Sequence, residues 1–86
     1  MEADYIGQLV SGKVLAVFRW GVILDVSLSR VGLIDALYVD NGDSYVVGEA
    51  VDVYLDSFDG QKDKFIARPP GQIPLAERLR RKGFDV

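Results

Sequence analysis

Carboxylates are the reactive side chains that this 86-residue sequence offers in number, because it has thirteen aspartates and glutamates but no cysteine and no histidine. The missing cysteines exclude disulfides, thiol nucleophiles and zinc–thiolate sites. The missing histidines remove the most common general base and the most common metal ligand. Acid–base chemistry by carboxylates alone stays open. We nevertheless expect a protein that is not an enzyme and that carries no cofactor.

An acidic loop is the candidate for cation binding. Asp40 and Asp43 flank an Asn-Gly pair in a stretch typical of loops, where two carboxylates could hold a hard cation. A twelve-residue calcium loop also needs a glutamate at its last position, and none follows at that spacing. We therefore interpret the stretch as a solvated connection and predict no metal site.

The single tryptophan, Trp20, could act through its π-face instead. It stands in the sequence Arg19-Trp20-Gly21, at a bend between two apolar runs. A large aromatic side chain at such a bend could belong to the core or could form an exposed platform for a ligand. The local sequence leaves both interpretations open.

Two β-strands must position that bend. Val22, Leu24 and Val26 alternate with Ile23 and Asp25, a period of two that predicts a half-buried strand over about 20–26. In the strand before the bend, Val14 and Val17 are three residues apart. That spacing breaks strict alternation and predicts a β-bulge or strong coiling of the strand.

Three further strands complete the predicted sheet. The Asp59-Gly60 pair is a hairpin signal, and the consecutive prolines Pro69 and Pro70 end the sheet by removing backbone donors. A long connection over 37–45 follows the third strand, and a short helix over about 74–82 begins at Pro74. The sequence thus predicts five strands. The first begins within 6–12 and ends at about residue 18, and the other four span about 20–26, 31–36, 51–56 and 64–68.

The chain divides into a body over 1–71 and a tail over 72–86 of opposite charge. The body has six basic and eleven acidic residues, a net charge of −5, whereas the tail has four basic and two acidic residues, a net charge of +2. An acidic body disfavours a protein that wraps duplex nucleic acid, since such proteins are basic. The basic tail could dock on its own body or contact an acidic partner.

Five segments carry a family resemblance: Ile6-Gly7, Gly12-Lys13-Val14-Leu15-Ala16-Val17, Trp20-Gly21-Val22-Ile23-Leu24, Gly32-Leu33-Ile34 and Val47-Gly48-Glu49-Ala50-Val51-Asp52-Val53-Tyr54-Leu55-Asp56-Ser57-Phe58-Asp59. In order and spacing they resemble the S1 domain family of RNA-binding modules over about 6–68, apart from an extra residue in the final hairpin. The fold that this resemblance and the strand count imply is all-β: a five-stranded Greek-key barrel of the OB type, S1-like, followed by the short carboxyl-terminal helix.

The resemblance also implies which residues contact RNA. Family members use two aromatic residues of the second strand, a histidine after the third strand's Gly-Leu, and an aspartate and a basic residue that flank the last hairpin. These positions are occupied here by Trp20, Ile23, Asp35, Asp59 and Lys64, respectively. Lys13 and Arg19 could add positive charge to the same face. Ile23 has no π-face, and Asp35 places a carboxylate where the family has an imidazole.

Two functions from different classes follow. The first is weak single-stranded RNA binding by a non-catalytic module of translation or RNA metabolism. The second is a protein-interaction or inhibitor-like module that has lost RNA binding, favoured by Ile23, Asp35 and the acidic body; its protein partner would meet the acidic body or the basic tail. We expect a cytoplasmic protein without a membrane partner, because the acidic amino terminus lacks a secretion signal and no apolar run reaches the roughly 20 residues of a membrane span.

Overall fold

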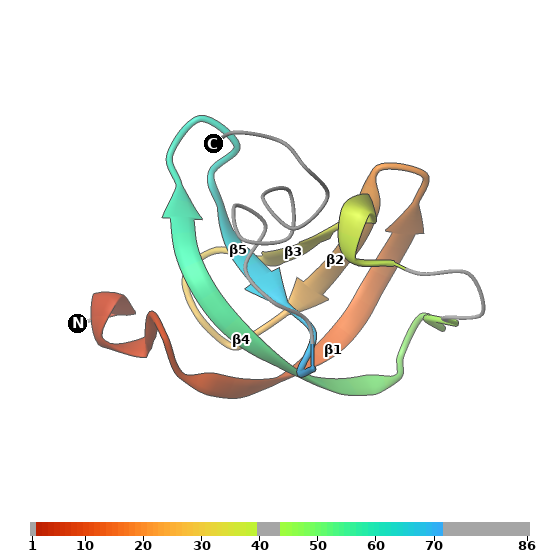
Figure 1. Cartoon of the computed structure of the whole chain (residues 1–86), viewed down its shortest axis with the longest axis horizontal. Helices are drawn as coiled ribbons and strands as arrows, with labels where there is room; N and C mark the ends of the chain where they lie inside the picture. The colour runs from red at the N-terminus through yellow and green to blue at the C-terminus, as the bar shows by residue number, and fades with distance from the viewer. Residues whose placement is uncertain (1, 40–43, 72–86) are drawn as a thin grey trace.

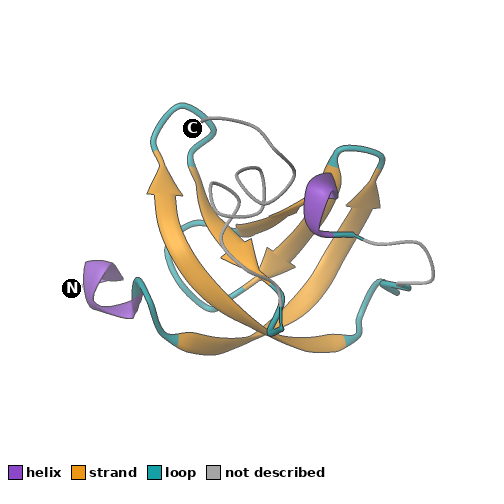
Figure 2. Ribbon diagram, viewed as in Figure 1, coloured by secondary structure: helices purple, strands orange, loops and turns teal. Residues whose placement is uncertain are grey.

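The computed structural model describes residues 2–39 and 44–71, in which five strands and two short 3₁₀ helices form the regular structure (Figures 1 and 2). The strands are β1 (Leu9–Phe18), β2 (Gly21–Asp25), β3 (Gly32–Asp35), β4 (Ala50–Asp59) and β5 (Lys64–Arg68); the helices are η1 (Glu2–Tyr5) and η2 (Ala36–Tyr38). Three predictions lie outside the described residues: the acidic loop at 40–43, the helix over 74–82 and the tail over 72–86.

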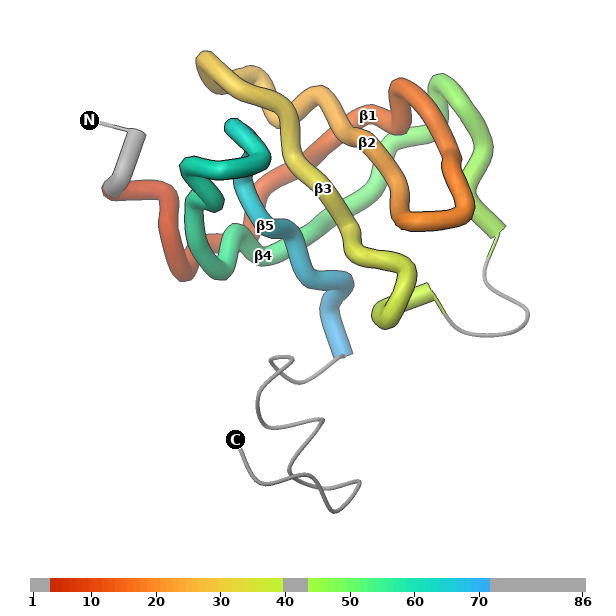
Figure 3. Tube along the Cα trace, turned by 90° about the horizontal axis from the view of Figure 1, so that it is seen from above, coloured from red at the N-terminus to blue at the C-terminus, as the bar shows by residue number. Residues whose placement is uncertain are grey.

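The strands close into a barrel in the order β1-β2-β3-β5-β4, with β4 pairing back to β1. All pairs are antiparallel except β3 and β5, which run parallel because the chain crosses over between them. Figure 3 shows β3 between β2 and β5. This arrangement confirms the predicted all-β, five-stranded OB-type barrel.

The first strand is long and bulged. Its first half pairs with β4 and its second half with β2, and the register with β2 shifts between Val14 and Ala16. Leu15, in the shift, is exposed on the barrel surface. A bulge bends a strand and increases its twist, which lets one strand serve two neighbours of a small barrel. The bulge predicted from the valine spacing is confirmed.

Alternation along the strands fills the barrel interior. Val22 and Leu24 of β2 are buried whereas Ile23 between them is half-buried on the outer side, as predicted. Among residues 2–39 and 44–71, the largest fully buried side chain is that of Tyr38, which comes from η2 and not from a strand. The buried core cluster comprises Val14, Val22, Leu24, Val26, Ile34, Tyr38, Val53, Leu55, Phe65 and Ala67.

Candidate functional site

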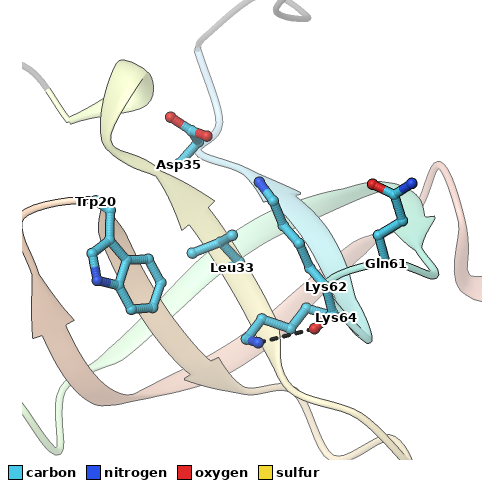
Figure 4. Close-up of a pocket in the computed structure, with 6 residues that line it drawn as sticks. All are labelled: Trp20, Leu33, Asp35, Gln61, Lys62 and Lys64. Atoms are coloured by element: carbon cyan, nitrogen blue, oxygen red, sulfur yellow. Dashed lines mark hydrogen bonds between the residues drawn. The ribbon is translucent and has the colours of Figure 1, made fainter.

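An open groove of about 540 Å³ lies on the outer side of the barrel, between the turn that joins β1 to β2, strand β3, and the turn from β4 into the start of β5 (Figure 4). It combines one large aromatic ring, an apolar floor, one carboxylate and two ammonium groups. The lining residues are Trp20, Leu33, Asp35, Gln61, Lys62 and Lys64.

Trp20 stands at one side of this groove, in the tight turn between β1 and β2. Its side chain is 52% exposed, which decides the open question in favour of a surface position. The ring of Phe18 stacks on it with the centroids 4.7 Å apart and the planes within 5° of parallel. The Trp20 carbonyl also accepts a 3.1 Å hydrogen bond from the backbone N–H of Ala36. Stacking and backbone contact together position the indole, and Phe18 covers one of its two faces.

Leu33 forms the apolar floor, and Gly21 makes the room for it. Leu33 pairs with Ile23 on one side and with Ile66 on the other, a row that faces away from the barrel interior. It is nevertheless only 2% exposed. Gly21 has a φ of +154°, and a Cβ there would lie 2.7 Å from Leu33 Cδ1. The missing side chain therefore lets Leu33 lie flat beneath the groove.

Asp35 ends β3 and begins η2. Its extended backbone makes it the N-cap of that helix, and its Oδ1 accepts a 2.9 Å hydrogen bond from the N–H of Leu37. In the sheet register Asp35 lies opposite Gly21, the residue after Trp20. The carboxylate is thus held at the same end of the groove as the indole.

The turn between β4 and β5 supplies one of the two cations, Lys62, and the first residue of β5, Lys64, supplies the other. Oδ1 of Asp59 accepts hydrogen bonds from the N–H groups of Gln61 at 2.9 Å and Lys62 at 3.1 Å. The ammonium group of Lys64 donates a 3.0 Å hydrogen bond to the Lys62 carbonyl. Asp59 therefore stabilises the turn through these hydrogen bonds without lining the groove, whereas Lys62 and Lys64 line it.

Removing the Asp59 carboxylate should loosen this turn. We expect Asp59→Ala to lower the free energy of unfolding by about 1–2 kcal/mol, because two backbone donors lose their shared acceptor. Asp59→Asn keeps an oxygen at the same place and should cost less than half as much. Urea denaturation followed by tryptophan fluorescence measures both values, and equal losses for the two variants would contradict this role.

The structure brings three of the seven predicted contact residues into one groove: Trp20, Asp35 and Lys64. Ile23 lies beside the floor through its pairing with Leu33. Arg19 is exposed in the Trp20 turn but is not part of the groove lining. Lys13 pairs with Asp25, at the far end of β2 from that turn, so we do not assign it to the groove.

Four residues at the site are absent from the sequence-based prediction. Leu33, Gln61 and Lys62 line the groove, and Phe18 stacks on Trp20. For Phe18 a signal was present, because a bulge at Leu15 puts Ala16 and Phe18 on the outer face. For Leu33 the signal is its alternation with the core residue Ile34, which places Leu33 on the outer side of β3. Gln61 and Lys62 depend on how the turn folds, which the Asp-Gly signal does not specify.

Two carboxylates of β4 and the β4–β5 turn are paired with arginines and not with the groove lysines. Arg68 contacts Asp56 at 3.0 Å across β5 and β4 and lies over the Tyr54 ring. Arg30 binds Asp63 at 2.8 Å. Within residues 2–39 and 44–71, no cluster of three carboxylates could hold a metal ion. The groove is therefore suited to noncovalent binding of a ligand with both flat and anionic parts.

Comparison with known proteins shows which solved structures share the fold of this barrel. No protein-family model and no curated protein matches the chain. Among solved structures, GSP13 from Bacillus subtilis is 19% identical, with a TM-score of 0.62 over 94% of this chain and 72% of that one. A multidomain protein with nucleic acid binding domains from Streptococcus pneumoniae is 12% identical, with a TM-score of 0.67 over 93% of this chain and 31% of that one.

A third similar structure belongs to the a/eIF2alpha–aDim2p–rRNA complex from Pyrococcus horikoshii; it is 14% identical, with a TM-score of 0.63 over 91% of this chain and 51% of that one. The barrel of this chain has the S1-like OB fold. The predicted resemblance is thereby confirmed at the level of the fold. In the described part of the chain, no helix has the length and apolar character needed to cross a membrane.

Proposed function

We propose that this chain is a non-catalytic module that binds single-stranded RNA weakly through the groove beside Trp20, in translation or RNA metabolism. One observation carries the proposal: a half-exposed indole stands at the same groove as two lysine side chains. An aromatic face stacks a base, and ammonium groups attract the phosphates on either side of it.

The groove favours a single strand over a duplex. A base can stack on an indole only when it is free of its own neighbours, as in loops and unpaired segments of RNA. The acidic body, with its net charge of −5, also disfavours duplex binding, because proteins that wrap a duplex are basic. The described outer face therefore suits one or two unstacked nucleotides.

Weak affinity follows from the small number of contacts. A stacked base contributes about 1–3 kcal/mol. A dissociation constant of 1 μM corresponds to about 8 kcal/mol. Because Phe18 already occupies one face of the Trp20 ring, one face remains for a base. We expect dissociation constants weaker than about 10 μM for short oligonucleotides.

The similar structures support nucleic acid as the ligand class. The Streptococcus pneumoniae protein has nucleic acid binding domains, and the Pyrococcus horikoshii structure is a complex that contains rRNA. The choice of RNA over DNA rests on the S1 resemblance of the sequence. The absence of histidine and cysteine supports a binding role rather than catalysis.

Titration of fluorescently labelled octauridine at low salt tests this function. Trp20→Ala should weaken binding at least about fivefold, because the base loses its stacking surface. Tyr5→Ala is the matched control, since Tyr5 is a 44% exposed aromatic residue on η1 that does not line the groove. Circular dichroism confirms that both variants fold.

Two results would reject RNA binding at the groove: no response of the wild type at millimolar protein, or an unchanged affinity of Trp20→Ala. The protein-interaction function would then be preferred, because the Asp35 carboxylate in the groove repels phosphate. A partner that stays bound in ribonuclease-treated lysate would identify that function.

A further inference from the structure

We infer that Asp35 makes the groove a subsite for guanine, so that a strand with a guanine at the Trp20 position binds more tightly than one with uracil. The inference rests on the proposed RNA binding and adds which base is preferred. It begins from a residue that departs from the S1 pattern, in which this position is a histidine.

The Asp35 carboxylate is held in place with acceptor capacity to spare. Oδ1 accepts the N–H of Leu37, so the side chain is fixed as the cap of η2. Among the residues that the structure describes, no cation pairs with this carboxylate. An ionised carboxylate has about four lone-pair sites and no donor. It can therefore accept at least two more hydrogen bonds, and it selects ligands with N–H groups.

The position of Asp35 suits the edge of a base stacked on Trp20. Gly21, next to Trp20, is the cross-strand partner of Asp35, and the Trp20 carbonyl binds the N–H of Ala36. Neighbouring strands lie about 4.8 Å apart. A base on the exposed indole face would therefore point its edge along the groove toward the carboxylate, over the apolar floor of Leu33.

Guanine has the complementary edge. Its N1–H and exocyclic N2–H groups are adjacent donors that one carboxylate can accept together, whereas its O6 and N7 are acceptors that lysine binds well. Figure 4 shows the Lys62 side chain extending toward the Asp35 end of the groove. Uracil presents two carbonyl oxygens around one N–H, so the carboxylate would repel it. Cytosine and adenine each offer one amino group there and should be intermediate.

Four octamers of matched length measure this preference: octauridine, and the same strand with guanine, inosine or cytosine at its fourth position. The wild type should bind the guanine strand about tenfold more tightly than octauridine, because the carboxylate makes a bidentate contact with guanine and none with uracil. Inosine lacks the N2 amino group and should lose severalfold of that gain.

Asp35→Asn is the diagnostic variant. Its side-chain oxygen can still cap η2 at Leu37, but an NH₂ group replaces the second acceptor. The guanine preference should fall to within about twofold. Asp25→Asn is the matched control, because Asp25 likewise accepts the N–H of the residue two positions on, Ser27, at 2.9 Å, and lies at the other end of β2.

The outcomes separate the two proposals. Equal affinity of the wild type for all four strands, or a guanine preference that survives Asp35→Asn, overturns the guanine subsite while RNA binding stands. Loss of the preference in both asparagine variants also overturns it, because the effect would then come from net charge. If no strand binds at millimolar protein, RNA binding itself is rejected.

Discussion

Gly21→Ala is expected to lower the free energy of unfolding by about 3–5 kcal/mol. Gly21 has a φ of +154°, a conformation that costs a residue with a Cβ about 1–3 kcal/mol. A Cβ would also press on the carbonyl oxygen of Ile34 and lie 2.7 Å from Leu33 Cδ1. Because the carbonyl belongs to the paired strand β3, the clash cannot be relieved by a rotamer change, and overpacking of this kind adds about 1–3 kcal/mol.

Gly60→Ala is the control for this prediction. A Cβ at Gly60 would meet nothing within 4 Å, and its φ is not in the positive range. Alanine there should leave stability unchanged or raise it by up to about 1 kcal/mol, because the unfolded chain loses freedom. Urea denaturation of the two variants gives the comparison. A loss below about 1 kcal/mol for Gly21→Ala would show that β2 and β3 can separate at this point without cost.

The strands could be predicted from the sequence because each has a local signal. Alternation defined β2, the Asp59-Gly60 pair located the final hairpin, and the spacing of Val14 and Val17 indicated the bulge. These signals depend on residues close together in the chain. The closure of the barrel through the parallel β3–β5 pair joins distant segments, and it followed from the strand count and the family resemblance, not from a local pattern.

The groove was only partly predictable because its members are brought together by the turns. The sequence allows Trp20 to be either a core or a surface residue. In the structure the turn leaves its side chain 52% exposed and stacked on the ring of Phe18. Asp35 had no visible second role in the sequence, since its cap on η2 depends on a three-residue helix without a periodic pattern. Lys62 enters the groove through the turn that Asp59 organises. Side-chain placement in turns follows from such hydrogen bonds rather than from periodicity.

Tyr38→Ala should also destabilise the barrel strongly, by about 3–5 kcal/mol, the range for deleting a large buried aromatic side chain. Tyr38 is 2% exposed and is the largest fully buried side chain among the described residues, yet it belongs to η2. Domains of this size have about 5–15 kcal/mol of stability in total. The melting temperature should therefore fall by at least about 12 °C.

Leu37→Ala is the control that distinguishes the loss of a buried side chain from a general effect of substituting a residue in η2. Leu37 precedes Tyr38 in η2 but is 53% exposed, so its truncation should change stability by less than about 0.5 kcal/mol. Thermal melts of both variants, followed by circular dichroism, test the pair. Similar melting temperatures for the two variants would mean that η2 contributes through its backbone and not through the buried ring.

The Tyr38 substitution also connects the core to the groove. Tyr38 anchors η2 in the barrel interior, and Asp35 caps the same helix at its other end. When the ring is removed, η2 loses its anchor, and the Asp35 carboxylate loses its fixed orientation beside Trp20. At a temperature where Tyr38→Ala is still folded, the guanine preference should thus weaken more than the affinity for octauridine. A preference that stays at the wild-type value would show that the Leu37 hydrogen bond alone holds the carboxylate in place.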